Sequence, residues 1–350
     1  MAQTQIGLNK ARLERLCHRA VRVMDIDLAG MRVLTEAATG PFAATAVIAA
    51  LAGADVVAVA RDSHWGKAKT AIDATASLAE RVGVLDRIAF RVGEGHEFAN
   101  GCDIVTNLGF IRPIDARTIG VLSPYAVVSL MWEPWEFRSG DIDRNALNAY
   151  GVPLIGTNEN HPEVRTLAYL GPTVGRLLLE VHIEIVRAHI LVMGSDPFGS
   201  VVAGWLSRAG AMVKSATWNT WREVLIANRP WDALVLVEHL EMSTVIGADD
   251  ATFLKILAED GVPIVRLCGL VERESILSAG VTLFPDMDVI AGVMAVTTAY
   301  AGPRPVIDLH AAGLKVGGLI VAARRNGANL KNAIAAAVSS GYALAMKDEE

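Results

Sequence analysis

The sequence predicts an α/β protein with two domains, each built on a doubly wound parallel sheet. Three observations favour this class. Short apolar runs rich in Ala and Val alternate with amphipathic helical stretches, as in strands that helices cover on both faces. The alternation occurs twice, on either side of one long helical segment. The chain has 350 residues, of which 52% are hydrophobic, enough for two buried cores.

In the first half, hydrophobic periodicity predicts helices at 8–24, 41–52 and 67–82, and strands at 31–35, 55–60, 87–92, 103–107, 126–130 and 153–156. A long helix follows over 162–187. The second half predicts strands at 189–193, 211–217, 233–237, 263–267 and 281–284, with a helix at 197–208. The remainder is predicted to be mostly helical.

The two halves also repeat a short motif. T-G-P-F at 39–42 and S-D-P-F at 195–198 each follow a predicted strand and open a helix, which favours a duplicated Rossmann-like unit. We therefore expect two Rossmann-like doubly wound parallel-sheet domains linked by crossing helices. Their predicted bounds are 1–160 for the first domain, 161–187 for the crossing helix, 188–308 for the second domain, and 309–350 for a helical segment that returns to the first.

Composition excludes several classes of partner. The net charge is −6 without a basic cluster, so nucleic acid is not expected. The most apolar stretch, 43–60, divides into a helix and a strand, so we expect no membrane span. Three cysteines far apart predict neither disulfides nor a metal site. The N-terminus lacks the apolar core of a signal peptide, so the expected location is cytoplasmic. The high apolar fraction suggests a homodimer.

Two turns have the small residues that a dinucleotide pyrophosphate requires at a helix N-terminus. The second half has Gly194-x-Asp196-x-x-Gly199, with Thr217 at the end of the next strand. The first half has Ala38-x-Gly40-x-x-Ala43, and its next strand ends at Arg61. An arginine there often meets the 2′-phosphate of NADP. An ordinary strand–helix turn and a solvated arginine explain the first-half pattern equally well. In the second half, Asp196 is a good helix N-cap, and its carboxylate would repel a phosphate at that position.

Polar residues also gather where predicted strands end, which is where ligands bind in open α/β sheets. Asn107 follows one strand, and Trp132 and Glu133 follow the next. Asn158, Glu159 and His161 follow a third. We expect Asn107, Trp132, Glu133 and Asn158 to contact substrate, and Glu159 and His161 to be secondary candidates for acid–base work. The alternatives are packed loops and helix caps.

The order of elements resembles the D-2-hydroxyacid dehydrogenases of the formate/glycerate dehydrogenase superfamily. GVPLIGTNENHPEVRTLAYLGPTVGRLLLE at 151–180 is similar to the helix that crosses between that family's domains. The Gly194–Gly199 turn follows it at a suitable distance. VPIVRLCG at 262–269 and LHAAG at 309–313 resemble the family's substrate-arginine and catalytic-histidine segments. The departures are Asp196 in place of a glycine and the lack of a clear match for the family's acidic residue.

The resemblance implies His310 as the acid–base residue, Arg266 as the fork that holds a substrate carboxylate, and Asp286 as the nearest candidate for the residue that orients the histidine. The leading hypothesis is an NAD(P)-dependent oxidoreductase that acts on a small carboxylate-bearing substrate in the cleft between the domains, with NADP favoured by Arg61. One alternative is an S-adenosylmethionine-dependent transferase. The turn at 38–43 and the segment at 83–95 follow each other in the order typical of a methyltransferase Rossmann unit. Another is a non-catalytic metabolite-binding protein.

Overall fold

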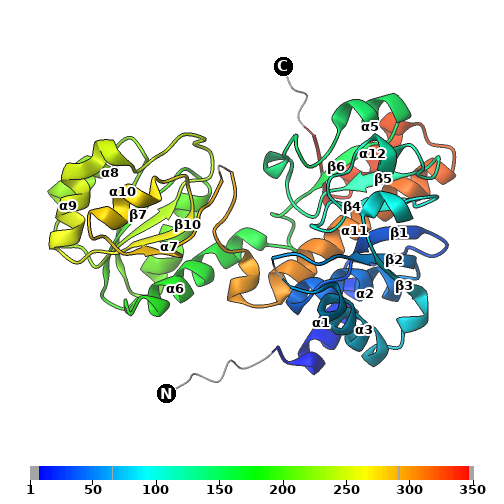
Figure 1. Ribbon diagram of the computed structural model, residues 1–350, viewed down its shortest axis with the longest axis horizontal. Coiled ribbons are helices and arrows are strands. Elements are labelled where there is room, and N and C mark those ends of the chain that lie inside the picture. The colour runs from blue at the N-terminus through cyan, green and yellow to red at the C-terminus, as the bar shows by residue number, and fades with distance from the viewer. Residues whose placement is uncertain (1–7, 65, 291, 347–350) are drawn as a thin grey trace. The chain divides into compact units, whose positions relative to one another are not determined.

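The computed structural model describes residues 8–64, 66–290 and 292–346. They form two compact units (Figure 1). Unit 1 comprises the chain up to Arg165 and again from Pro303, and unit 2 comprises Thr166–Gly302. The C-terminal helices thus pack in unit 1. The predicted crossing segment divides at Arg165, where a positive φ of 50° interrupts the chain direction.

Unit 1 contains a seven-stranded sheet in the order β12-β6-β5-β4-β1-β2-β3. Its strands are β1 (Arg32–Glu36), β2 (Asp55–Ala60), β3 (Ile88–Val92), β4 (Ile104–Thr106), β5 (Val127–Ser129), β6 (Leu154–Thr157) and β12 (Ala343–Ala345). All pairs are parallel except β12 with β6. The sequence analysis missed β12, because three residues after a helix carry no recognisable alternation.

The helices of unit 1 are α1 (Lys10–Val23), α2 (Ala44–Leu51), α3 (Ala68–Arg81), α4 (Ala116–Ile119), α5 (Arg144–Tyr150), α11 (Arg304–Arg325) and α12 (Leu330–Ser339). The side chains of successive strand residues point to opposite faces of the sheet. Val33 and Ile104 pack in the core beneath α2 and α11, whereas Leu34 and Val105 pack in the core beneath α4 and α5. The strands are therefore buried on both sides, as the doubly wound prediction requires.

Helix α11 is the central helix of unit 1. It is long and apolar enough to span a membrane, but 78% of its most apolar window is buried, as in a core helix. A helical segment that returns to the first domain was expected over 309–350. It begins earlier, because one helix runs from Arg304 through the LHAAG segment to Arg325. Gly327, at φ +86°, then turns the chain into α12.

Unit 2 contains a five-stranded parallel sheet in the order β11-β10-β9-β7-β8. Its strands are β7 (His189–Met193), β8 (Met212–Ala216), β9 (Ala233–Val237), β10 (Ile264–Cys268) and β11 (Leu283–Phe284). Its helices are α6 (Leu170–Glu180), α7 (Phe198–Arg208), α8 (Trp221–Ala227), α9 (Ala251–Glu259) and α10 (Arg273–Ser278). The predicted helix over 162–187 shrinks to α6, because a 3₁₀ turn precedes it and His182 has a φ of +62°.

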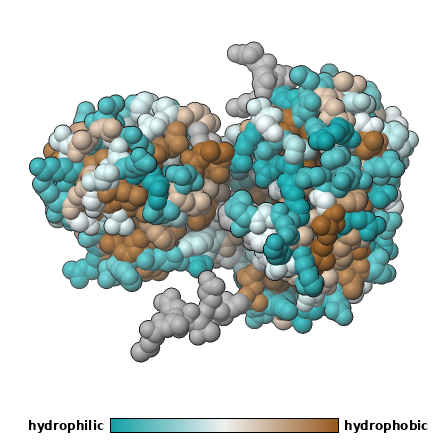
Figure 2. Space-filling view, in the orientation of Figure 1, coloured by the Kyte–Doolittle hydropathy of each residue, from teal (hydrophilic) through white to brown (hydrophobic). Residues whose placement is uncertain are grey.

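The prediction of two parallel α/β units is confirmed. Figure 2 shows hydrophilic and hydrophobic residues interspersed over the visible face. Each sheet also reverses its strand order once, between β1 and β4 in unit 1 and between β7 and β9 in unit 2. Ligands of open α/β sheets bind beyond the carboxyl ends of the strands that flank such a reversal. We call these places the first and the second switch point.

Candidate functional sites at the two switch points

The second switch point has the geometry of a nucleotide-binding turn. A Cβ on Gly194 would lie 2.5 Å from the Val237 carbonyl oxygen, and a Cβ on Gly199 would lie 2.6 Å from the Gly194 carbonyl oxygen. Only glycine therefore fits at either position. Asp196 lies between them, and its Oδ1 accepts a hydrogen bond of 3.0 Å from the Ser200 amide of α7. Asp196, one residue before the N-cap Pro197, thus provides an acceptor for an amide in the first turn of α7.

A buried carboxylate links the two strands of this switch point. Glu238, at the end of β9, is only 1% exposed. Its Oε2 accepts from the Ser195 hydroxyl at 2.8 Å, and its Oε1 accepts from the Leu240 and Glu241 amides. The neighbouring His239 ring stacks on Phe198 at 4.0 Å, and burial lowers its pKa. The sequence analysis missed both residues, although a charged pair that ends a buried strand was a usable signal.

Beside this turn, β8 ends without a carboxylate. The Thr217 amide donates to Thr220 Oγ1 at 3.1 Å, and the two hydroxyls lie 3.1 Å apart. Elsewhere in unit 2, Arg266 is buried within β10, where its Nη2 donates to the Met287 carbonyl. Asp286 forms an ion pair with Arg273. Each of these side chains thus has a partner within its own unit, although Arg266 Nε is buried without an acceptor among the described residues.

His310 lies elsewhere, in the middle of α11 in unit 1. It is 4% exposed, its Nδ1 shares a hydrogen bond of 2.6 Å with Thr45 Oγ1, and its ring packs against Phe42. Burial lowers its pKa to about 3, so the imidazole is neutral. Neither unit alone contains the expected triad of His310, Arg266 and Asp286, and the placement of His310 is that of a structural core residue.

The dinucleotide-like turn of the first half is filled by its own chain. Thr75 Oγ1 accepts from the Ala38 amide and donates to the Ala38 carbonyl, both at 3.0 Å. Gly40, at φ +62°, opens a 3₁₀ turn rather than a long helix. Arg61 forms an ion pair with Glu94 and donates to the Arg112 carbonyl. Arg61 and the turn at 38–43 thus have partners within unit 1, and their roles in binding NADP or S-adenosylmethionine stay predictions.

Three glutamates cluster at the carboxyl ends of β5 and β6. Glu133 Oε1 accepts from the Glu159 amide at 3.2 Å, and the Glu136 and Glu159 side chains share a hydrogen bond. Burial, followed by the neighbouring carboxylates, raises the pKa of Glu159 well above its usual range. Burial also raises the pKa of Glu136 to about 7. From the sequence, Glu133 was expected to contact substrate and Glu159 to do acid–base work, and Glu136 of the same W-E-P-W-E segment was given no acid–base role.

The local fold explains why these carboxyls meet. The 3₁₀ turn Pro134–Glu136 lies on β6, since a Cβ on Gly156 would come within 2.5 Å of Pro134 Cδ. The other predicted residues after β6 support structure. Asn158 Nδ2 donates to the Gly341 carbonyl at 2.8 Å, and His161 stacks on Tyr342 at 3.7 Å. These contacts hold β12 against the sheet.

The first switch point lies between Glu36, the last residue of β1, and Asn107, which follows β4. Glu36 is 8% exposed, and its Oε2 accepts from the Phe110 amide at 3.1 Å. Burial raises the pKa of Glu36. Arg112 forms an ion pair with Asp141, and its guanidinium lies 5.6 Å from the centre of the Trp132 ring. Glu36 and Arg112 were missed by the sequence analysis, although both are charged residues near strand ends.

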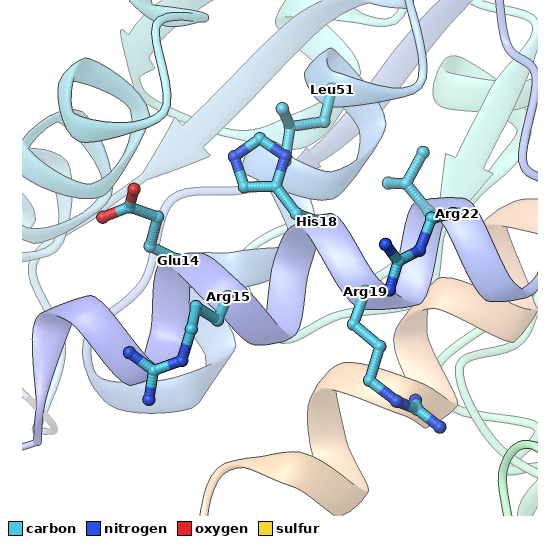
Figure 3. A pocket seen from close by; sticks show the side chains of 7 residues that line it. Glu14, Arg15, His18, Arg19, Arg22 and Leu51 are labelled. Atoms are coloured by element: carbon cyan, nitrogen blue, oxygen red, sulfur yellow. The ribbon is translucent and has the colours of Figure 1, made fainter.

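A surface hollow lies along α1, away from the strand ends (Figure 3). It is lined by Glu14, Arg15, His18, Arg19, Val21 and Arg22 of α1 and by Leu51 of α2. Arg19 leaves the hollow to pair with Glu163 and Asp308. No convergent set of polar groups defines a ligand there. The described residues also contain no group of three or more His, Cys, Asp or Glu side chains that could hold a metal ion.

No family model matches the sequence, and no curated protein is found as a relative. Solved structures do match. One of the subunits of dipicolinate synthase from Bacillus halodurans is 12% identical, with 81% of this chain and 96% of that chain covered at a TM-score of 0.53. The A chain of dipicolinate synthase from Bacillus subtilis is also 12% identical, covering 82% and 95% at 0.52.

A weaker match is the NAD-dependent formate dehydrogenase of Staphylococcus aureus in complex with NAD, at 11% identity, 85% and 95% coverage and a TM-score of 0.43. The expected resemblance is thus one of fold, and the two dipicolinate synthase chains carry it. At identities near 12%, a shared fold does not show that two proteins share an activity. The chain therefore has the fold of these dipicolinate synthase chains, with two Rossmann-like units.

Proposed function

We propose that this protein is an NAD(P)-dependent oxidoreductase that acts on a small carboxylate-bearing substrate. The observation that carries the proposal is the Gly194–Gly199 turn at the second switch point, which opens into the 11-residue helix α7. In doubly wound sheets, a dinucleotide usually binds at a glycine turn after the first strand. We thus assign cofactor binding to unit 2. Unit 1 is assigned substrate binding and proton transfer.

The residues of the second switch point fit such a cofactor. Gly194 and Gly199 allow the strand, turn and helix to approach closely, as a bound pyrophosphate requires. Asp196 must turn away from the Ser200 amide, which forfeits a helix cap worth about 1 kcal/mol. That loss is small beside the roughly 8 kcal/mol of a micromolar complex. Thr217 and Thr220 at the end of β8 carry no charge that would select for or against a 2′-phosphate, so both NAD and NADP are candidates.

When bound, the nicotinamide cofactor supplies or accepts a hydride. The protein must then move a proton. Glu136 is suited to this, because burial places its pKa at about 7, where a carboxyl both donates and accepts protons at neutral pH. Glu159, hydrogen-bonded to Glu136, holds the second proton of the pair. This pair takes over the acid–base role that the sequence analysis assigned to His310.

The test is direct titration of the full-length protein with NADH, NADPH, NAD⁺ and NADP⁺, followed by quenching of tryptophan fluorescence. We expect micromolar binding of at least one dinucleotide. The Asp196→Gly variant removes the carboxylate from the turn and should bind at least tenfold more tightly. The Asp73→Asn variant, at an exposed ion pair on α3, is the matched charge control and should leave affinity unchanged.

Turnover is then assayed with a panel of 2-oxo and 2-hydroxy acids. If neither the wild-type protein nor Asp196→Gly binds any dinucleotide, the oxidoreductase proposal is wrong and the non-catalytic alternative replaces it. If dinucleotides bind and Glu136→Gln retains full turnover at every pH, the cofactor assignment stands and the proton assignment is overturned.

A further inference from the structure

We infer that the first switch point is a binding site for the carboxylate group of a small ligand, formed by the side chains of Asn107, Arg112 and Trp132. The inference deepens the proposed function, because it identifies the residues that hold the substrate's carboxylate and places them in unit 1, in the role that sequence resemblance gave to Arg266. It is carried by three buried hydrogen-bond donors that have no acceptor among the described residues.

Asn107 is the most informative of the three. It is fully buried at the end of β4, and its Oδ1 accepts from the Met131 amide at 2.8 Å. Because an amide N–H can only donate, this bond fixes which side-chain atom is the oxygen. Asn107 Nδ2 is therefore a true donor, and it has no acceptor in the part of the chain that the structure describes. Buried donors of folded proteins are nearly always paired, so this one indicates a missing acceptor.

Arg112 and Trp132 supply the other donors. The guanidinium of Arg112 lies over the Trp132 ring and pairs with Asp141 through Nη1. These contacts hold both side chains in place but use neither Arg112 Nε nor Trp132 Nε1, which are both buried and without a partner among the described residues. Trp132 directly follows Met131, whose amide binds Asn107. The three donors thus come from two neighbouring loops, after β4 and after β5.

The surrounding charges select the type of acceptor. Arg112 and Arg138 are cations of the site, since both lie over the Trp132 ring and reach Asp141. The carboxyls that face Arg112 are Asp141 and Glu36. The pKa of Glu36 is raised by burial, which favours its neutral form. A singly charged planar carboxylate matches the three donors and the modest positive charge. A doubly charged phosphate would meet Asp141 with too little compensation.

The test measures ligand binding to the full-length protein without any cofactor. The probes are malonate, succinate and 2-oxoglutarate, with succinamide as the uncharged control and inorganic phosphate as the alternative anion. Binding is followed by calorimetry and by the shift in thermal midpoint. We expect at least one of the carboxylates to bind and to stabilise the protein, and both succinamide and phosphate to have no effect.

Three variants assign the binding to this site. Asn107→Asp keeps the acceptor for Met131 but replaces the free donor by a carboxylate oxygen, and should weaken binding more than tenfold. Arg112→Lys keeps the charge beside Asp141 and loses Nε, and Trp132→Phe keeps an aromatic ring and loses Nε1. Each should weaken binding severalfold. Arg117→Gln, at an exposed arginine of α4, is the control and should bind as wild type does. If Asn107→Asp does not fold, the other two variants decide.

The inference is overturned if no carboxylate binds, if phosphate binds instead, or if Arg112→Lys and Trp132→Phe bind as wild type does. It fails separately from the proposed function. The three variants should retain the dinucleotide affinity of the wild-type protein, since they lie in unit 1. Carboxylate binding without dinucleotide binding would support this site and refute the oxidoreductase, and the reverse result would refute this site alone.

Discussion

The two switch points have the same topology but are filled in different ways. At the second, close backbone contacts require Gly194 and Gly199, and the Asp196 carboxylate accepts from the Ser200 amide in the first turn of α7. At the first, the equivalent turn after β1 is occupied by Thr75, and Glu36 binds the loop that follows β4. Strand order therefore places an opening in each unit, and the side chains around it decide whether the protein or a ligand occupies it.

The difference also separates two kinds of chemistry. The second switch point offers close backbone approach and a helix N-terminus, which suit a nucleotide. The first offers buried donors and, beyond the neighbouring strands β5 and β6, glutamates whose pKa values are raised. These suit a small polar substrate and a proton. Four substitutions can break or sharpen this contrast.

The largest effect is expected from Gly194→Ala. Its Cβ would lie 2.5 Å from the backbone oxygen of Val237, which has no freedom to move away. We expect a loss of about 3 kcal/mol or more in the free energy of unfolding, measured by urea denaturation. The control is Gly204→Ala in α7, where the nearest contact is the end of the Arg208 side chain at 3.4 Å. A tolerated Gly194→Ala would mean that the turn is not constrained by backbone contact.

His310→Ala should destabilise unit 1 by about 2–4 kcal/mol, because it leaves a cavity and an unpaired Thr45 hydroxyl. The pKa of His310 is lowered to about 3 in the folded protein. Its stabilising contribution is therefore present above pH 6.5 and is lost as the pH falls toward 3. The variant should be less sensitive to acid than wild type, in thermal denaturation between pH 7 and pH 4.

The control for this prediction is His18→Ala, at an exposed residue of α1 shown in Figure 3. It should change neither stability nor its pH dependence. If His310→Ala instead retains full stability and loses turnover, the acid–base role implied by the family resemblance is right and the structural role is wrong.

Glu136→Gln should have a smaller effect on stability, and one of opposite sign. The pKa of Glu136 is raised to about 7 in the folded protein. Its contribution is thus present below pH 4.5 and is lost as the pH rises through 7. Relative to wild type, the variant should gain of order 1–3 kcal/mol between pH 5 and pH 8. Glu80→Gln, an exposed residue of α3, should show no such gain, and equal curves for Glu136→Gln and wild type would disprove the raised pKa.

The smallest effect is expected from Asn158→Ala. It removes the 2.8 Å bond to the Gly341 carbonyl and the turn that Asn158 forms with Asn160. The cost should be about 1 kcal/mol, seen as faster hydrogen exchange in β12. Asn145→Ala on the exposed face of α5 is the control. Loss of carboxylate binding in Asn158→Ala would show that Asn158 contacts substrate, as the sequence analysis expected.

Periodicity along the chain determined the two α/β units, their parallel sheets and the position of the glycine turn. These features depend on local spacing: apolar runs for buried strands, and small residues where a strand meets a helix. The cytoplasmic location and the homodimer stay predictions from composition alone. Periodicity did not predict the short elements, because β12 and the 3₁₀ turns contain too few residues to repeat a pattern.

Only the tertiary structure decided which candidates are buried, paired or left without a partner. His310 and Arg61 look like functional residues in the sequence, and Thr45 and Glu94 give them structural partners from distant segments. Glu136 becomes a candidate acid because the loop that carries it lies on β6, beside Glu159. Burial and charge pairing arise between residues far apart in the chain, so spacing along the sequence cannot determine them.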